Sequence, residues 1–373
     1  MNLPFTIQEY KERVRRVQKE MAAAGLHALI LSKPQNIYYL SGNRASYIGA
    51  PLTSLHVLVV PSDGDPVLIC RKLEEEAVKE QWTKDPQLYL DHEDPYGYLR
   101  QVISKLKAAE GKIGIEERNL IKTTYDRIKQ VLPNSKLVDI SGMVDKIRLT
   151  MNQKEVEYTL KAAEITERGF RRGIDLLKEG GLYNEVVGEM ENAMYKAGQS
   201  EQDSSLVLVW GGPEGGGMHD TFVDKRVRSG DLVTIEVHGI YNHYRAASQG
   251  TVFVGNNVPS KIKDLYRLVS DMHDACASAV APGITFEELF EVANRPYKKA
   301  TGQDYFRRVG GTLGLSLFDI SSVRGEKSKV LEGYCLLLQP LTISPLITVT
   351  SSGLVTKDGY KVLNGSLRDL VQK

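Results

Sequence analysis

The stretch that decides the fold runs from Gly230 to Gly255 and reads GDLVTIEVHGIYNHYRAASQGTVFVG. Two apolar strands flank a short polar turn, YNHY, which is the pattern of a β-hairpin. Side chains two residues apart in a strand leave the same face, so Glu236 and His238 are expected to point the same way. A carboxylate beside an imidazole allows two interpretations: the beginning of a metal site, or an acid–base pair that needs no metal.

Three of the seven histidines, His219, His238 and His243, lie in this hairpin or shortly before it. A site with mixed nitrogen and oxygen ligands needs about three or four such groups converging on one point. His219 lies in the glycine-rich loop GGPEGGGMHDTF, a common place for a functional side chain on a rigid scaffold. His243 lies in the turn, where an exposed residue is the simpler interpretation. A hydrogen-bonded pair of Glu236 and His238 fits the spacing as well as a ligand set does.

The composition is that of an ordinary globular protein. Of 373 residues, 42% are hydrophobic and 25% are charged, and the formal net charge of +1 argues against nucleic acid or an anionic membrane surface as the partner. The apolar runs are too short to span a bilayer. The N-terminal stretch lacks the apolar core of a signal peptide, and three widely spaced cysteines fit buried thiols in a reducing compartment. We therefore expect a cytoplasmic protein.

The first part of the chain alternates helices and strands, which predicts an α/β domain over residues 1–146. Apolar residues at intervals of three or four predict a helix over 7–24, which Gly25 ends. The stretch LHALILS predicts a buried strand, and LHVLVVPSDGDPVLIC predicts a hairpin that turns at Asp63-Gly64. Further helices are expected over residues 73–81, 97–108 and 123–131, with KIGIEE as a strand between the last two.

Residues 147–373 combine helix pairs with antiparallel hairpins, which predicts an α+β domain. The long amphipathic helix that starts at NQKEVEYTLKAAEIT opens with Asn152 and Glu155, a pair that resembles a capping box. Later helices are expected over residues 183–198, 260–281 and 285–301. The closing third predicts strands at YCLLLQPL, LITVTSSGLVT and YKVLNG.

With these elements in place, the whole chain resembles the creatinase/prolidase/aminopeptidase P family, whose fold is a creatinase-type N-terminal domain followed by a pita-bread domain. The resemblance is carried by NIYYLSG, by KIRLTMNQKEVEYTLKAAEIT, by the His219 loop leading into the hairpin, by RVGGTLGLSL and by GLVTKDGYKVLNG. Their order and spacing match along nearly the full length. The resemblance also implies a homodimer, in which the loop SGNRASYIGAP with Arg44 and Tyr47 reaches the neighbouring chain's pocket.

Metallopeptidases of this family hold two metal ions with two Asp, one His and two Glu, and the resemblance places these five positions here. They fall on Glu236, Ala247, Gly311, Gln339 and Thr350. One carboxylate cannot neutralise two divalent ions in a low-dielectric pocket, so a dinuclear metallopeptidase is not expected. A further family histidine, in the His-Glu pair that follows the Gly-His-Gly motif, falls on Phe318.

His219 matches the histidine that metal-free creatinase uses as its acid–base group. The positions of the glutamates that hold creatine's guanidinium carry Gln249 and Gln339 here, and two amides do not pair with a cation as two carboxylates do. The resemblance therefore implies a neutral or zwitterionic amide, lactam or cyclic amidine as substrate. Glu236 would activate water, and His219 would protonate the leaving nitrogen.

Three functions remain open from the sequence. The first is a creatinase-like or ectoine-hydrolase-like hydrolase that cleaves a C–N bond without a metal or other cofactor. The second is a catalytically inactive pseudo-peptidase that binds a small molecule or acts as a scaffold. The third is a mononuclear metal hydrolase or Xaa-Pro peptidase built on Glu236, His238 and His219. In addition to the catalytic pair Glu236 and His219, the candidate substrate-binding residues are His238, Tyr241, His243, Tyr244, Arg245, Gln249, Gln339, Phe318, Arg44 and Tyr47.

Overall fold

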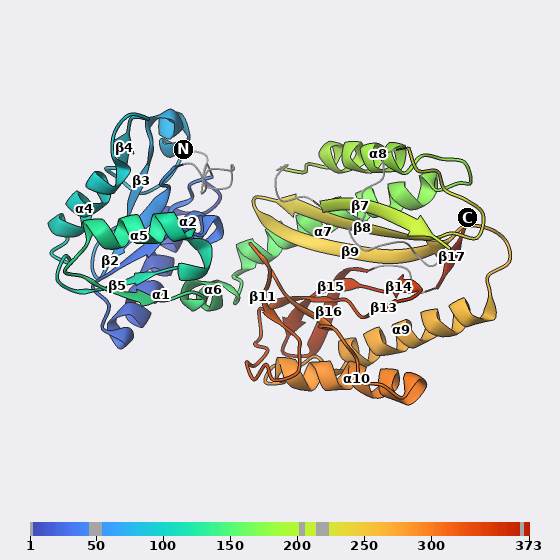
Figure 1. The fold of residues 1–373 in the computed structure, drawn as a ribbon. Helices are drawn as coiled ribbons and strands as arrows, with labels where there is room; N and C mark the ends of the chain where they lie inside the picture. The colour runs from blue at the N-terminus through green and yellow to red at the C-terminus, as the bar shows by residue number, and fades with distance from the viewer. Residues whose placement is uncertain (1–2, 45–53, 201–205, 214–223, 366–368) are drawn as a thin grey trace. The chain divides into compact units, whose positions relative to one another are not determined.

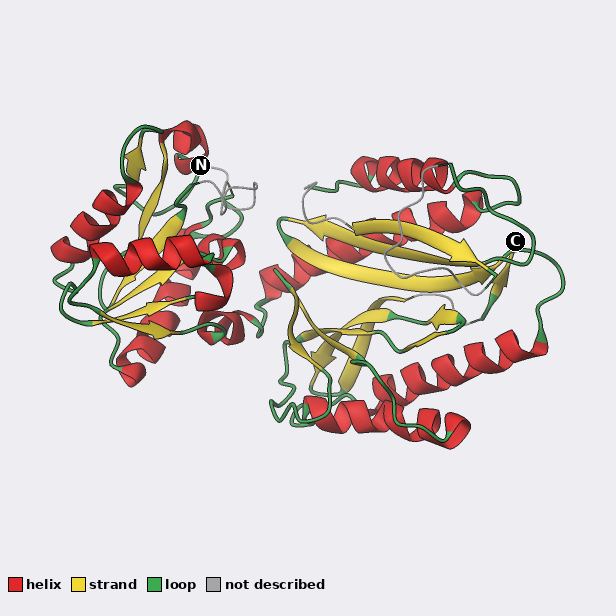
Figure 2. Ribbon diagram, viewed as in Figure 1, coloured by secondary structure: helices red, strands yellow, loops and turns green. Residues whose placement is uncertain are grey.

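The computed structural model describes residues 3–44, 54–200, 206–213, 224–365 and 369–373. The chain divides into two compact units, Met1–Arg148 and Leu149–Lys373, so the observed boundary follows residue 148 where the sequence suggested residue 146. Figures 1 and 2 show mixed strands and helices in the first unit, and long strands covered by long helices in the second. The predicted fold class, α/β followed by α+β, is confirmed.

The N-terminal unit is built on a six-stranded sheet with the order β4-β3-β2-β1-β5-β6. Strand β1 (Ala28–Leu31) pairs antiparallel with β2 (Val57–Pro61) and parallel with β5 (Lys112–Ile115). The remaining strands are β3 (Val67–Arg71), β4 (Gln87–Tyr89) and β6 (Lys136–Asp139). The helices are α1 (Ile7–Ala24), α2 (Pro34–Ser41), α3 (Glu75–Val78), α4 (Pro95–Lys105), α5 (Lys122–Val131) and α6 (Met143–Arg148). The predicted hairpin is confirmed as β2–β3, whereas the helix expected over 73–81 is only the short α3 preceded by a 3₁₀ turn.

Helix α1 shows why the sequence pattern predicted it correctly. The Thr6 hydroxyl accepts a hydrogen bond from the Glu9 backbone N–H, and the Glu9 carboxylate accepts one from the Thr6 backbone N–H, so two unpaired helix donors are satisfied reciprocally. Gly25 ends the helix in the left-handed conformation with φ of 65°. The predicted apolar stripe of Tyr10, Val14, Val17 and Met21 is buried.

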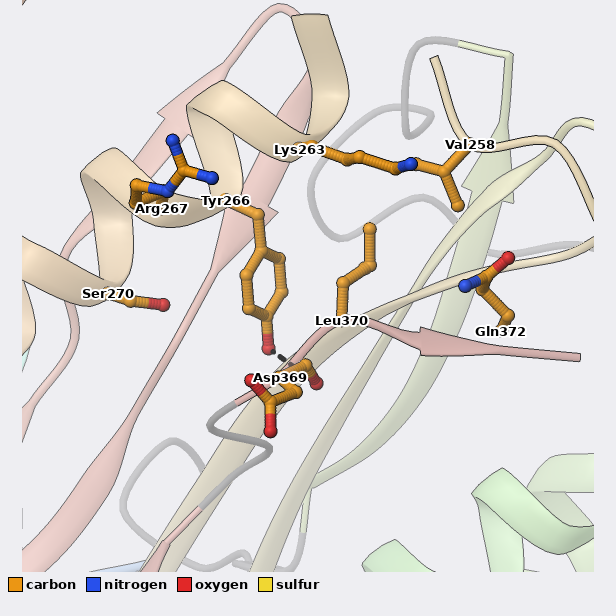
Figure 3. A pocket seen from close by; sticks show the side chains of 8 residues that line it. All are labelled: Val258, Lys263, Tyr266, Arg267, Ser270, Asp369, Leu370 and Gln372. Carbon is orange, nitrogen blue, oxygen red and sulfur yellow. Dashed lines mark hydrogen bonds between the residues drawn. The ribbon is translucent and has the colours of Figure 1, made fainter. Parts of the chain in front are cut away.

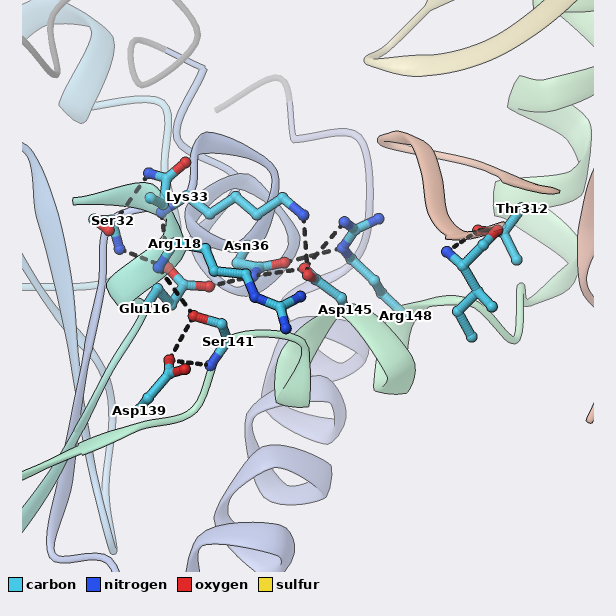
Figure 4. A network of polar contacts seen from close by, with 12 residues as sticks. Ser32, Lys33, Asn36, Glu116, Arg118, Asp139, Ser141, Asp145, Arg148 and Thr312 are labelled. Carbon is cyan, nitrogen blue, oxygen red and sulfur yellow. Dashed lines mark hydrogen bonds and ion pairs between the residues drawn. The ribbon is translucent and has the colours of Figure 1, made fainter. Parts of the chain in front are cut away.

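A buried carboxylate fastens the chain where β1 leads into α2. Glu116, which follows β5, accepts hydrogen bonds from the backbone N–H groups of Ser32 and Lys33 at 2.7 and 2.8 Å (Figure 4). The Asn36 side-chain amide donates to its other oxygen. Because a helix N-terminus presents unpaired N–H groups and a partial positive charge, a carboxylate here stabilises the start of α2.

The C-terminal unit contains two main sheets. The first has the order β17-β9-β8-β7 and is covered on one face by α7 (Gln153–Leu176) and α8 (Tyr183–Lys196). Its strands are β7 (Leu206–Gly212), β8 (Leu232–Tyr241), β9 (Tyr244–Phe253) and β17 (Val371–Gln372). The predicted capping box at the start of α7 is confirmed, with Asn152 and Glu155 bonded reciprocally.

The second sheet has the order β11-β10-β12-β15-β16 and packs against α9 (Ser260–Ala279) and α10 (Phe286–Thr301). Its strands are β10 (Gly310–Leu313), β11 (Leu317–Ser321), β12 (Cys335–Leu338), β15 (Ser351–Thr356) and β16 (Gly359–Gly365), and β13 (Leu341–Ile343) pairs separately with β14 (Leu346–Thr348). Within the described ranges, no helix combines the length and apolar character that a membrane span requires.

The alternation of side chains along β8 separates packing from chemistry. Val233, Ile235 and Val237 join the core beneath α7 and α8, so Glu236 and His238 leave the opposite face. Helix α7 crosses β8 at Gly239, where an added Cβ would come within 2.5 Å of the Ala162 carbonyl oxygen. The hairpin can therefore bury one face completely against helices while its other face stays polar.

Hydroxyl groups join the polar side of β9 to the second sheet. The Thr350 hydroxyl both accepts from the backbone N–H of Gln249 and lies 2.9 Å from its carbonyl oxygen. The Ser352 hydroxyl makes the same two contacts with Ala247 at 3.0 and 2.8 Å. These contacts bring β15 alongside the polar face of the hairpin and place residues about one hundred positions apart in one site.

Candidate functional site

Glu236 is the buried carboxylate at the centre of the hairpin's polar face. Its Oε1 lies 2.9 Å from Nε2 of His238, and its Oε2 accepts a hydrogen bond of 3.1 Å from the Gln249 side-chain amide. Gln249 lies directly opposite Glu236 in the β8–β9 ladder. None of the three residues is more than 6% exposed. Glu236 and His238 therefore contact each other directly, as the spacing of two residues in one strand predicts.

The carboxylate sets the direction of a chain of amide hydrogen bonds. An ionised carboxylate only accepts, so Gln249 must turn its amide nitrogen toward Glu236 and its oxygen away. That oxygen accepts from the Gln339 amide at 2.8 Å, and it lies 3.3 Å from the Thr348 hydroxyl. The chain ends at Gln339 Oε1, a buried acceptor that has no donor in the described part of the molecule.

Two arginines supply the positive charge of the site. Arg307 and Arg308 are half-buried just before β10, and the charge of Glu236 acts on both. Burial lowers the pKa of each guanidinium, and the negative charge of Glu236 opposes that effect. The Arg308 guanidinium lies 4.4 Å from the centroid of the Phe318 ring. Two cationic side chains therefore lie near Glu236, a position at which the family's metallopeptidases carry a metal ligand.

The residues at the five family metal positions do not fit a dinuclear centre. Gln249 directs amide protons at Glu236, so the space beside the carboxylate faces a donor. Thr350 and Ala247 are occupied by contacts between strands. Among the described residues, no group of three or more His, Cys, Asp or Glu side chains could hold a metal ion.

Gly311 stands where the resemblance places the histidine ligand. A Cβ added there would come within 2.4 Å of the Ile320 carbonyl oxygen and 2.6 Å of Phe318 Cδ1. The Phe318 ring thus fills space that a side chain at position 311 would need. Phe318 has φ of 59°, a left-handed conformation that is strained for a bulky residue. This strained backbone holds the Phe318 ring against the Arg308 guanidinium.

The predicted substrate contacts from the hairpin turn are divided between the two faces. Tyr241 and Tyr244 lie on the α7 side, 5.6 and 5.9 Å from the ring of Tyr158, and the Tyr244 hydroxyl donates to Glu155 at 2.6 Å. This packing does not support a role for either tyrosine in substrate binding. Arg245 shares the face of Glu236.

The expectation that His243 is an exposed turn residue is wrong. His243 is only 4% exposed, and both it and the preceding Asn242 have positive φ values, 66° and 47°. Two successive left-handed residues make the tight hairpin turn that matches strand twist. The His243 imidazole is therefore buried, although the turn YNHY is polar in sequence.

Two predicted residues, His219 and Tyr47, lie outside the described residues. Arg44 is exposed in the N-terminal unit. The role of these residues and the homodimer stay predictions. The three cysteines are buried thiols, as expected, and burial raises the pKa of each to about 12, which makes them poor nucleophiles.

Sequence reasoning missed Arg307, Arg308 and Thr348. The only signal for the arginines was their position directly before the VGGTLG motif. A polar pocket of about 350 Å³ lies between α9 and the C-terminal strand and includes Lys263, Arg267 and Asp369 (Figure 3). None of the predicted site residues lines it.

Comparison with known proteins gives two consistent matches. Residues 13–150 match the Creatinase/Prolidase N-terminal domain, and residues 157–361 match Metallopeptidase family M24. An uncharacterized peptidase from Staphylococcus aureus strain MW2 is 28% identical over 361 residues, which cover 94% of this chain and 98% of that protein.

Solved structures agree on the fold. A prolidase from Thermococcus sibiricus superimposes with a TM-score of 0.87 at 24% identity, covering 98% of this chain and 99% of that one. An Xaa-Pro dipeptidase from Bacillus anthracis gives 0.84 at 20% identity, covering 98% and 100%. The expected creatinase-type and pita-bread domains are thereby confirmed, and the chain belongs to metallopeptidase family M24.

Proposed function

We propose that this chain hydrolyses a C–N bond in a small polar, peptide-like molecule at the Glu236 site, without a pair of metal ions. The observation that carries the proposal is the buried contact of 2.9 Å between the Glu236 carboxylate and the His238 imidazole. Both groups transfer protons readily, and burial strengthens their mutual influence. Relatives named prolidase and Xaa-Pro dipeptidase make Xaa-Pro dipeptides the first substrates to test, beside lactams and cyclic amidines.

The reaction consumes one water. The oxygen of this water forms a bond to the carbonyl or amidine carbon while Glu236 takes a proton from the water. His238, whose Nε2 contacts Glu236 Oε1, holds the carboxylate in position. The C–N bond then breaks as the nitrogen receives a proton. His219, by its match to the acid–base histidine of creatinase, is the proposed donor. An amide or lactam gives a carboxylic acid and an amine, an amidine gives an amide and an amine, and no oxidant or reductant is required.

A specific observation favours a second candidate, a protein that binds such a molecule without cleaving it. Both oxygens of Glu236 already contact donors or a ring nitrogen, from Gln249 and His238. A general base must approach the water whose proton it removes, so one of these contacts has to open during turnover. A binding protein has no such requirement.

Turnover separates the two candidates. Chelator-treated protein would be incubated with Xaa-Pro dipeptides, small lactams and cyclic amidines, and amine release measured. We expect Glu236→Gln to lower kcat about 10²- to 10⁴-fold, the usual contribution of a general base. Glu332→Gln, which changes an exposed carboxylate, is the matched control and should keep full activity. Amine release that requires added Zn²⁺ or Mn²⁺ would overturn the proposal, and ligand binding without any amine release would favour the second candidate.

A further inference from the structure

The cavity between α9 and the C-terminal strand shares no residue with the Glu236 site, and its size is that of a small-molecule site. Its volume of about 350 Å³ lies in the range of roughly 300 to 1,000 Å³ that ligand pockets occupy. Four of its residues recur on α9 at intervals of three, one and three positions, so they share one face of the helix. The helix supplies Lys263, Tyr266, Arg267 and Ser270, and the C-terminal segment supplies Asp369 and Leu370 (Figure 3).

Part of the cavity wall is apolar and fixed in place. Tyr266 and Val258 belong to a buried cluster of the C-terminal unit, and Leu370 packs against the same cluster. The Tyr266 hydroxyl donates to the Asp369 carbonyl at 3.3 Å, and β17 pairs with β9. The strand that borders the cavity is therefore held on both sides, and the cavity is preformed with an apolar surface for the body of a ligand.

The charged residues of the cavity lack close partners. Lys263 makes no ion pair with any described residue. Arg267 lies 3.8 Å from Asp264, and these two side chains are 74% and 72% exposed. An ion pair so exposed contributes little to stability, so it does not hold the guanidinium back from a ligand. Asp369 lines the same cavity, yet within the described ranges it forms no ion pair with either cation.

Ser270 is independent evidence that a hydrogen-bond acceptor belongs in the cavity. Its Oγ is buried and has no hydrogen-bond partner in the part of the chain that the structure describes. A serine hydroxyl within a helix commonly donates to the carbonyl four residues earlier, and Ser270 does not. Since a buried polar group without a partner costs free energy, native proteins keep few of them. An acceptor atom of a ligand would satisfy this hydroxyl.

Helix geometry places the three donors within reach of one ligand group. Residues three and four positions apart on a helix have Cβ atoms roughly 5 to 6 Å apart, so Arg267 is adjacent to both Lys263 and Ser270. With Asp369, the lining carries two positive charges and one negative charge, which favours a monoanion over a dianion such as phosphate. A carboxylate has this charge, and its oxygens accept from ammonium, guanidinium and hydroxyl groups.

We infer that this cavity binds a small carboxylic acid with an apolar body. The carboxylate accepts hydrogen bonds from Lys263, Arg267 and the Ser270 hydroxyl, and the apolar body packs against Tyr266 and Leu370. Binding here involves no bond cleavage and is independent of the proposed function at Glu236.

The test compares four probes titrated into the full chain by calorimetry: 4-methylpentanoate, 4-methylpentanamide, acetate and inorganic phosphate. The first carries both the charge and the apolar body, the amide lacks the charge, and acetate lacks the body. We expect 4-methylpentanoate to bind at least about tenfold more tightly than the amide, because charged donors lose their anionic acceptor. It should also bind at least about tenfold more tightly than acetate, because acetate buries less apolar surface. Phosphate should bind more weakly than 4-methylpentanoate.

Variants locate the binding. Lys263→Gln and Arg267→Gln should each weaken 4-methylpentanoate about fivefold or more. Ser270→Ala should weaken it about threefold without lowering the melting temperature, because the hydroxyl has no partner to lose when the cavity is empty. Lys261→Gln removes an exposed lysine of the same helix that does not line the cavity. It is the charge-matched control and should bind as the wild type does.

Equal binding of the acid and the amide, or no detectable binding of the acid, would overturn the inference. Acid binding that Lys263→Gln and Arg267→Gln both leave unchanged would also overturn it, because the ligand would then lie elsewhere. The comparison of the four probes uses wild-type protein, so it holds even if a variant fails to fold. Amine release tests Glu236 separately, so failure of one proposal leaves the other intact.

Discussion

Glu116 and Glu236 are both buried glutamates beside strands, yet they are held in opposite ways. Glu116 accepts from two backbone N–H groups and from Asn36, and Asn36 in turn donates to Asp145 and accepts from Arg148 (Figure 4). Glu236 contacts only side chains in its resolved bonds. The Asn36 amide uses all of its polar atoms, whereas the amide chain from Glu236 ends in an unpaired oxygen. The network around Glu116, in which every polar atom of Asn36 is bonded, stabilises the fold. The network around Glu236 ends in an unpaired acceptor and can therefore bind a ligand.

The largest expected effect is on the free energy of unfolding, and it distinguishes the structural carboxylate of Glu116 from the functional carboxylate of Glu236. Glu116→Gln should lower the free energy of unfolding of the N-terminal unit by about 3 kcal/mol. The glutamine oxygen can still accept from the two backbone N–H groups, but its amide nitrogen would face the Asn36 amide donor, whose orientation Asp145 and Arg148 fix. Glu236→Gln should cost about 1 kcal/mol or less, since His238 can change tautomer and Gln249 can turn its amide.

The two tryptophans allow each unit to be followed separately. Trp82 lies in the N-terminal unit and Trp210 in the C-terminal unit, and both are buried. Urea titrations of Trp210→Phe and Trp82→Phe backgrounds would report the two units through tryptophan fluorescence. Equal losses from the two glutamine substitutions would contradict the contrast between a structural and a functional carboxylate.

A smaller effect on stability is expected at acid pH. Burial, and secondarily the charge of Arg71, lowers the pKa of His56 from 6.5 to about 4. Below pH 6.5 the unfolded chain takes up a proton that the folded N-terminal unit does not. The stability contributed by neutral His56 is therefore present above pH 6.5 and is lost as the pH falls toward 4, with about 2 kcal/mol lost at pH 5.

The difference between wild type and His56→Gln isolates this contribution, because other groups titrate equally in both proteins. The Trp82 signal should show a wild-type stability that falls faster with decreasing pH than that of the variant. A parallel pH dependence in the two proteins would rule out the assigned role of His56.

The smallest expected effect lies in the functional network itself. Arg307→Met replaces a partly buried cation, one of whose donors is unpaired, with an apolar side chain of similar length. We expect the C-terminal unit to gain about 1 kcal/mol in the absence of ligand, because a site built for binding trades stability for function. Urea unfolding followed through Trp210 measures it. A loss of similar size would show that Arg307 is a structural cation like Arg148.

Local signals predicted the fold well. The Asn152–Glu155 capping box, the Asp63-Gly64 hairpin and the alternation that places Glu236 with His238 each depend on residues close in sequence. These features follow from backbone geometry that neighbouring residues determine, so a sequence is sufficient to read them.

The site could be predicted only in part. The bond between Gln249 and Gln339 joins residues 90 positions apart, and its direction depends on the charge of Glu236. The inward turn of His243 depends on positive φ at two residues that have no glycine to announce it. Arg307 and Arg308 gain their role from burial, which appears only when the second sheet is in place.

Metal analysis of the intact protein tests the central claim most directly. The chain would be purified without chelator and without added metal, and the metal bound per chain determined by elemental analysis after dialysis. We expect well below one equivalent, because Glu236 is balanced by guanidinium groups and faces amide donors. Two equivalents that survive dialysis and are lost in Glu236→Gln would contradict the proposal of a metal-free site.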